Sequence, residues 1–192
     1  MREAKINRST LETKIELDLK LDGCGSININ SGIGFFDHML KAMAFYAGFD
    51  LDVSCKGDLY VDTHHSVEDI GLSLGAAFKE ALGDKKGIQR FASPITPMDE
   101  SLVLVAIDIS NRPYLVDNFK FKSERIGDME TQCFKEFFHA FAMAAAITLH
   151  IDVMRGENDH HMIEAVFKGL GRAIKEVVCL VGSEVVSTKG VL

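Results

Sequence analysis

An internal repeat is the feature that most constrains how this chain folds. When the 192-residue sequence is shifted by half its length, the stretch HHSVEDIGLSLGAAFKEAL, beginning at His64, overlays HHMIEAVFKGLGRAIKEVV, beginning at His160. Further upstream, FFDHMLKAMAF and FFHAFAMAAAI align His38 with His139. A repeat of this kind indicates one structural unit used twice. We therefore expect two halves that fold alike.

The halves, residues 1–88 and 89–192, are predicted to merge into one compact duplicated domain with the same elements in each. Hydrophobic alternation indicates strands, and hydrophobic residues at helical spacing indicate helices. The first half has predicted strands at 4–9, 14–21, 26–30 and 50–55 and helices at 34–48 and 64–82. The second has predicted strands at 90–95, 102–109, 114–119 and 148–153 and helices at 130–147 and 160–178. Because a sheet with helices on one face must bury that face, we predict an α+β fold with two sheets flanking a central four-helix layer.

Composition narrows the classes of function. The net charge of −7 and the pI of about 5.5 argue against a general nucleic-acid-binding surface. The four cysteines form no C-x-x-C pair, and the sequence shows neither an opening signal segment nor a hydrophobic run of membrane-spanning length. We therefore expect reduced thiols, a cytoplasmic location, and no membrane or nucleic acid among the partners.

The repeated histidine pairs predict a metal site. On a helix, residues three or four apart share a face, whereas immediate neighbours diverge by about 100°. Glu68 can therefore converge with one of His64 and His65, while the other histidine serves a different ion. Divided over two sites, the paired repeat positions supply four ligands to each ion: His38, His64, His65, Glu68, His139, His160, His161 and Glu164.

The ligand types narrow the choice of metal but leave it open. Three imidazoles and one carboxylate suit Mn, Fe, Ni or Zn, and the lack of thiolate argues against a closed structural zinc site. Four protein ligands leave two positions of an octahedral ion for water or substrate. This is the layout of a catalytic site.

Several motifs resemble those of the imidazoleglycerol-phosphate dehydratase family. They run in order along nearly the whole chain: RSTLET (8–13), GIGFFDHML (32–40), DTHHSVEDIG (62–71), RPYLV (112–116), GENDHHMIEAVFKGLGRAI (156–174) and STKG (187–190). The resemblance implies a ribosomal protein S5 domain 2-like unit used twice, two Mn²⁺ ions per active site, and a homo-oligomer of 24 subunits with metal sites between subunits. It also implies conversion of D-erythro-imidazoleglycerol phosphate into imidazole acetol phosphate and water in histidine biosynthesis.

The chemistry can also be argued from such a substrate. The proton to be removed lies on a carbon with no neighbouring carbonyl, so a base alone would face a C–H bond of very low acidity. An imidazole ring with a metal at each nitrogen is held as imidazolate, and its electrons can then expel hydroxide to leave a diazafulvene-like intermediate. A positioned carboxylate or a metal-bound hydroxide can transfer the protons. The resemblance makes Glu12 a substrate-site residue and our candidate acid/base, with Glu164 as the alternative.

A phosphorylated substrate also needs cations in this acidic chain. Arginine forks suit phosphate oxygens, and a serine hydroxyl can add to them. Taken singly, such residues are more often solvated surface groups. The resemblance places at the phosphate Arg90, Arg112, Lys175, Ser187 and Lys189.

Two other classes of function fit the ligand set alone. One is a di-metal hydrolase of a small phosphorylated substrate, which dehydration without phosphate release would exclude. The other is an assembly protein whose histidines hold subunits together through metal without a catalytic role. Disassembly on metal removal, combined with full turnover in His-to-Ala variants, would favour this class.

Overall fold

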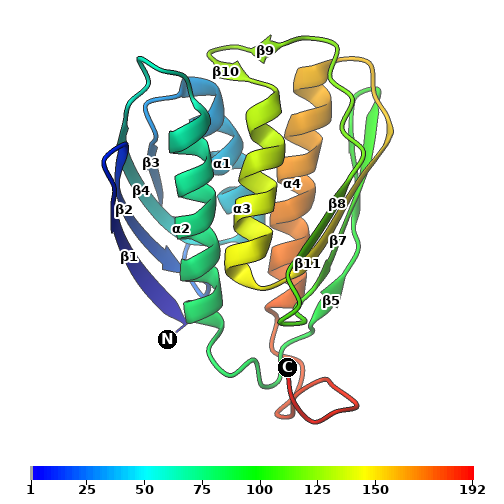
Figure 1. Cartoon of the computed structure of the whole chain (residues 1–192). Coiled ribbons are helices and arrows are strands. Elements are labelled where there is room, and N and C mark those ends of the chain that lie inside the picture. The colour runs from blue at the N-terminus through cyan, green and yellow to red at the C-terminus, as the bar shows by residue number, and fades with distance from the viewer. Residues whose placement is uncertain (1) are drawn as a thin grey trace.

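The computed structural model describes residues 2–192 and places four helices between two sheets (Figure 1). The first sheet has the order β1 (Glu3–Ser9), β2 (Thr13–Lys20), β4 (Asp50–Gly57), β3 (Ile27–Asn30) and packs against α1 (Gly34–Ala47) and α2 (His64–Leu82). The second has the order β5 (Phe91–Ala92), β7 (Ser101–Asp108), β11 (Thr148–Arg155), β8 (Tyr114–Asp117), with β6 (Ile95–Met98) also paired to β7. It packs against α3 (Gln132–Ala145) and α4 (Asp159–Val177).

The two sheets share one pattern of strand pairing. In the first, β2 is antiparallel to both β1 and β4, and β3 lies parallel to β4. In the second, β7 is antiparallel to both β6 and β11, and β8 lies parallel to β11. The predicted arrangement of two sheets flanking four helices is therefore confirmed, and the two halves have matching strand orders.

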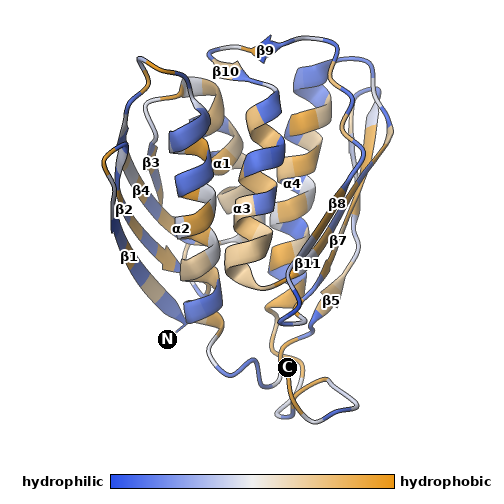
Figure 2. Ribbon diagram, viewed as in Figure 1, coloured by the Kyte–Doolittle hydropathy of each residue, from blue (hydrophilic) through white to orange (hydrophobic). Residues whose placement is uncertain are grey.

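Side-chain alternation determines which face of each sheet is buried. From Thr13 onward, every second residue of β2 is buried, and Figure 2 shows the corresponding hydrophilic and hydrophobic bands along the first sheet. The helices meet through phenylalanines: the ring of Phe137 on α3 lies 5.2 Å from that of Phe36 on α1 and 5.4 Å from that of Phe167 on α4. Over residues 2–192, no helix combines the length and hydrophobicity that crossing a membrane requires.

Two sequence predictions were wrong in detail. The single strand predicted at 90–95 is two short strands, β5 and β6, because Pro94 between them has no N–H to donate. The helix predicted from residue 130 begins at Gln132, because a hairpin of β9 (Arg125–Ile126) and β10 (Met129–Glu130) occupies the preceding residues. Gly127, with φ of 60°, makes the turn of this hairpin.

Glycines at identical repeat positions allow the helices to pack closely in pairs. A Cβ on Gly75 of α2 would lie 2.6 Å from the carbonyl oxygen of Phe141 on α3. A Cβ on Gly171 of α4 would lie 2.3 Å from the carbonyl oxygen of Met43 on α1. Both contacts are with backbone, which cannot move aside as a flexible side chain can. These glycines therefore set the spacing of α2 from α3 and of α1 from α4.

We predict that Gly171→Ala destabilises the fold although alanine favours helix by about 1 kcal/mol. Forcing a methyl group against the α1 backbone costs about 1–3 kcal/mol or more, so the urea midpoint of unfolding should fall. Gly182→Ala, at a glycine with open space around it, is the control and should leave the midpoint unchanged. An unchanged or higher midpoint for Gly171→Ala would contradict this account of the helix spacing.

Candidate functional site

Both histidine pairs lie in the first turn of a helix, and a polar side chain two residues earlier holds each helix start. Asp62 accepts a hydrogen bond from the backbone N–H of His64 at 2.8 Å. Asn158 accepts from the backbone N–H groups of His160 at 2.9 Å and His161 at 3.3 Å. Such acceptors satisfy N–H groups that lack an intrahelical partner. Asp62 and Asn158 occupy the same repeat position, so α2 and α4 present their histidines alike.

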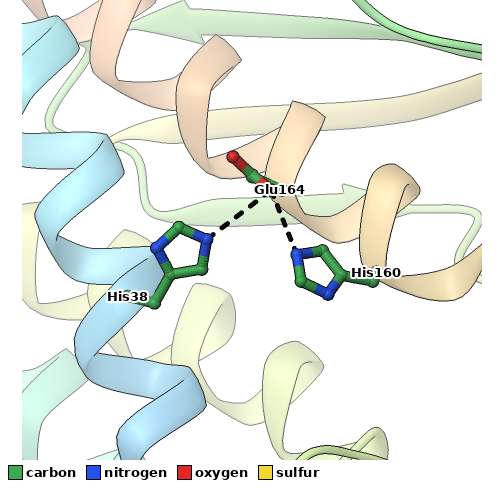
Figure 3. Close-up of side chains that lie close together, drawn as sticks. All are labelled: His38, His160 and Glu164. Atoms are coloured by element: carbon green, nitrogen blue, oxygen red, sulfur yellow. Dashed lines mark hydrogen bonds and ion pairs between the residues drawn. The ribbon is translucent and has the colours of Figure 1, made fainter.

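One cluster of potential metal ligands is already assembled within the chain (Figure 3). The Oε2 atom of Glu164 lies 3.1 Å from His160 Nε2, on the same helix, and 3.6 Å from His38 Nε2, on α1. In the described part of the chain, this is the one group of three His, Cys, Asp or Glu residues whose ligand atoms all lie within 4.8 Å of one another. Two imidazoles and a carboxylate at this spacing fit a divalent transition metal.

The short hairpin before α3 supports this cluster. Asp128, in its turn, accepts hydrogen bonds from the backbone N–H groups of Gly34 at 2.6 Å and Phe35 at 2.9 Å, at the start of α1. The Phe35 ring in turn packs edge-on against His160, with 5.0 Å between ring centroids. The hairpin thus fixes the start of the helix that carries His38.

Lys168 keeps the buried carboxyl of Glu164 ionised. Burial by itself raises the pKa of Glu164, but the hydrogen bond and charge of Lys168, with contributions from His38 and His160, outweigh burial and lower the pKa. The Lys168 Nζ lies 2.8 Å from Glu164 Oε1, so it leaves Oε2 facing the histidines. An ionised carboxylate with one oxygen free is suited to binding a cation.

The first half contains a more open counterpart of the cluster. His64 Nε2 lies 3.4 Å from Glu68 Oε2, which repeats the pairing of His160 with Glu164. His139, on α3, is exposed, and among residues 2–192 it completes no set as closely spaced as the one in the second half. The predicted ligands are thus brought together on one side and only partly on the other.

The second histidine of the first pair points away from Glu68, as helix geometry predicts. His65 Nδ1 lies 3.0 Å from Asp58 Oδ2, and its Nε2 lies 3.7 Å from Glu12 Oε1. The hydrogen bond that His65 donates to the Asp58 carboxylate raises the pKa of His65. Glu12 is at the tip of the β1–β2 hairpin, which is tied to α2 because the Thr13 hydroxyl donates to the Asp69 carboxylate.

The second pair repeats this arrangement with different carboxylates. His161 Nδ1 lies 2.8 Å from Glu100 Oε2, and its Nε2 lies 3.7 Å from Asp99 Oδ2. Sequence reasoning missed Asp58, Glu100 and the lysine beside Glu164 as neighbours of the site. Glu100 could have been found, because it stands immediately before β7 as Glu12 stands before β2.

Two of the predicted phosphate-binding residues lie side by side. Arg90 Nε lies 2.8 Å from Asp108 Oδ1, and Arg112 Nη2 lies 3.3 Å from Asp108 Oδ2. Arg90 also donates to the backbone carbonyl of Val186, next to Ser187. Its φ of 73° is in a region that side-chain-bearing residues rarely adopt. Arg90, Arg112 and the C-terminal segment therefore form one basic cluster at the edge of the second sheet.

The other predicted cations lie near this end of the molecule. Lys175 is in the last turn of α4 and, with Arg2, lines an open cavity of about 810 Å³. The backbone N–H of Lys189 donates to Ser187 Oγ at 3.2 Å within the C-terminal segment. In the described part of the chain, Lys175, Ser187 and Lys189 make no hydrogen bond or ion pair with the histidine cluster.

Comparison with known proteins identifies the family. A family model described as imidazoleglycerol-phosphate dehydratase matches residues 31–174. The chain belongs to this family. The imidazoleglycerol-phosphate dehydratase of Clostridioides difficile (strain 630) is 60% identical over 192 residues and that of Carboxydothermus hydrogenoformans is 53% identical over 192 residues, with full coverage of both chains in each case.

Solved structures agree with the sequence comparison. The crystal structure of imidazoleglycerol-phosphate dehydratase from Staphylococcus aureus has a TM-score of 0.85 at 36% identity, covering 93% of this chain and 99% of that one. The Pyrococcus furiosus enzyme, in complex with (S)-C348, has a TM-score of 0.85 at 39% identity, covering 97% and 100%. The chain is therefore a hydro-lyase, a dehydratase of histidine biosynthesis.

The histidine cluster and the predicted phosphate-binding lysine of α4 lie far apart along that helix. Glu164 and Lys175 lie on the same helix, eleven residues apart, which corresponds to about 16 Å along its axis. Figure 1 shows α4 running from the end of the molecule near β9 and β10 to the end near the C-terminus. Glu164 lies near the start of α4 and Lys175 in its last turn, so the two groups face different ends of the molecule.

We predict that Lys168→Met weakens Mn²⁺ binding more at pH 5.5 than at pH 7.5. Without the lysine, its hydrogen bond and charge no longer oppose the effect of burial, so the pKa of Glu164 rises and the carboxyl is more readily protonated as the pH falls. A protonated carboxyl no longer binds the cation. Competition with a fluorescent chelator at the two pH values measures the effect. Lys168→Arg keeps the charge and should resemble the wild type. Equal losses at both pH values for Lys168→Met would contradict this role of the lysine.

Proposed function

We propose that the chain converts D-erythro-imidazoleglycerol phosphate into imidazole acetol phosphate and water at a di-manganese site. The main support for a metal-dependent reaction is the cluster of His38, His160 and Glu164, whose ligand atoms lie within 4.8 Å of one another. Family membership supports the dehydration. A di-metal hydrolase would need the same ligands, but no comparison favours it.

We assign the eight predicted ligands to two Mn²⁺ ions. His38, His160 and Glu164 would hold one ion, and His64, Glu68 and His139 would contribute to the other. When bound, the two ions supply Lewis acidity to the two nitrogens of the substrate ring and thereby favour its imidazolate form. His65 and His161 face away from the glutamates of their own helices, so they are free to complete sites with other chains.

The exposure and contacts of Glu12 support a role in proton transfer. Its side chain is half exposed at the tip of a hairpin and makes no hydrogen bond in the described structure that would need to be broken. Glu164 is already in contact with Lys168, His160 and His38. We therefore propose Glu12 as the acid/base and Glu164 chiefly as a ligand.

We propose that the complete active site forms between subunits of a homo-oligomer. The separation of Glu164 and Lys175 along α4 supports an arrangement in which one chain supplies the metal end and another supplies the phosphate end. Family resemblance suggests 24 subunits, and the four widely separated cysteines suggest a cytoplasmic location. The resemblance also suggests that each half, residues 1–88 and 89–192, is a ribosomal protein S5 domain 2-like unit, which the matching strand orders support.

The proposed phosphate site comprises one arginine pair and three further groups. Asp108 holds Arg90 and Arg112 together, so their remaining N–H groups can converge on a single anion. Lys175, Ser187 and Lys189 would add a cation, a hydroxyl and a second cation from the C-terminal part of the chain.

Chelated protein is expected to lose dehydratase activity and to regain it when Mn²⁺ is added back. The assay follows imidazole acetol phosphate and free inorganic phosphate in the same reaction, and metal content is measured by elemental analysis. Product formation without phosphate release supports the proposal. Phosphate release would instead indicate a hydrolase, and full activity with less than one metal ion per chain would contradict the metal-dependent mechanism.

Glu12→Gln separates acid/base chemistry from metal binding in the same assay. Loss of a general acid/base costs about 10²–10⁴-fold in turnover, while Mn²⁺ affinity should stay at the wild-type value because Glu12 is not a proposed ligand. Glu16→Gln, at a similarly exposed carboxylate on β2, is the matched control. Wild-type turnover in Glu12→Gln would move the acid/base role to another residue.

A further inference from the structure

We infer that Asp58 and Glu100 are positioning residues that determine which ring nitrogen His65 and His161 offer to metal. The inference rests on the proposed metal site and deepens it. It concerns two carboxylates that are not themselves ligands and that come from different structural elements.

Asp58 fixes the ring of His65. It follows the last residue of β4, its side chain is only 13% exposed, and its two oxygens lie 3.2 and 3.0 Å from His65 Nδ1. An ionised carboxylate can only accept hydrogen bonds, so the proton must be on Nδ1. In the neutral ring, the lone pair is then on Nε2, which is the nitrogen left to bind a metal.

Glu100 produces the same arrangement for His161 from another part of the chain. Its Oε2 lies 2.8 Å from His161 Nδ1. Its Oε1 accepts from the backbone N–H groups of Glu157 at 3.2 Å and Asn158 at 2.9 Å, just before α4. The carboxylate is therefore anchored on one side and presents its other oxygen to the histidine.

Among residues 2–192, the first histidine of each pair has no carboxylate partner on Nδ1. His64 and His160 contact Glu68 and Glu164 through Nε2, the nitrogen that would bind the ion together with the carboxylate. Only the second histidines have a carboxylate on Nδ1. Because Asp58 follows a strand and Glu100 precedes one, the two halves reach the same ring orientation by different routes. That two different carboxylates hold His65 and His161 in the same way supports a functional role for the ring orientation of these histidines.

The test measures Mn²⁺ affinity of the full-length protein by competition with a fluorescent chelator. Removing a group that orients a metal-bound histidine typically weakens binding about 10–100-fold, and we expect this for Asp58→Ala. Asp58→Asn should lie between Asp58→Ala and the wild type, because its amide oxygen can still accept the Nδ1 proton. Glu157→Ala removes an exposed carboxylate near His161 whose side chain has no described polar contact, and it should bind as the wild type does.

Thermal unfolding of the metal-free variants separates positioning from folding. We expect Asp58→Ala to unfold near the wild-type temperature, and Asp58→Asn to restore part of the Mn²⁺ affinity. Wild-type affinity in both Asp58→Ala and Glu100→Ala would overturn the inference while leaving the metal site intact. A wild-type protein that binds no Mn²⁺ would overturn the proposed metal site and the inference together. Weakened binding in Asp58→Ala that Asp58→Asn does not improve would assign the effect to charge and also overturn the positioning role.

Discussion

The close packing of α1 against α4 is the constraint on which the rest of the structure depends. Gly171 lets the two helices approach so closely that a Cβ at this position would collide with the carbonyl oxygen of Met43 on α1. The same close approach brings His38 of the first half into contact with Glu164 of the second. The spacing that closes the hydrophobic core thus also sets the distance between ligands. The proposed metal site, built across two packed helices, would need no flexible loop to assemble it, because rigid elements already hold its side chains.

Local charge arrangements would let an acidic chain hold both the proposed metal cation and the proposed phosphate anion. Near the histidines, Lys168 offsets the rise in pKa that burial causes at Glu164. The carboxylate therefore stays ionised within the helix layer, as binding of a metal would require. Near the C-terminus, Asp108 holds Arg90 and Arg112 together and prevents their mutual repulsion from separating them. The net charge of −7 therefore does not indicate the local charge at either the histidine cluster or the arginine pair. At both places, the local ion pairs determine which ligand could bind.

Much of the architecture was predictable because short-range patterns determine it. The α2 helix has the predicted bounds, and the divergence of His64 from His65 follows from helix geometry alone. The hairpin before α3 was missed because hydrophobic residues around it continue the helical pattern. The repeat predicted paired ligands, but it could not show that α1 packs on α4, so that a histidine from one half completes the other half's cluster. Asp58 and Glu100 were missed because both lie in loops, and the sequence pattern does not show that these loops fold so that the two carboxylates contact His65 and His161.

The most direct test of the proposed manganese site is anomalous diffraction from crystals of the Mn²⁺-loaded protein, recorded above and below the manganese absorption edge. We expect a manganese peak within bonding distance of the Nε2 atoms of His38 and His160 and of the carboxylate of Glu164. The Nε2 atom of an outward-facing histidine from a neighbouring chain should complete the ligand set. Manganese bound elsewhere, or histidines of the cluster that remain without metal at saturating Mn²⁺, would contradict the proposed site.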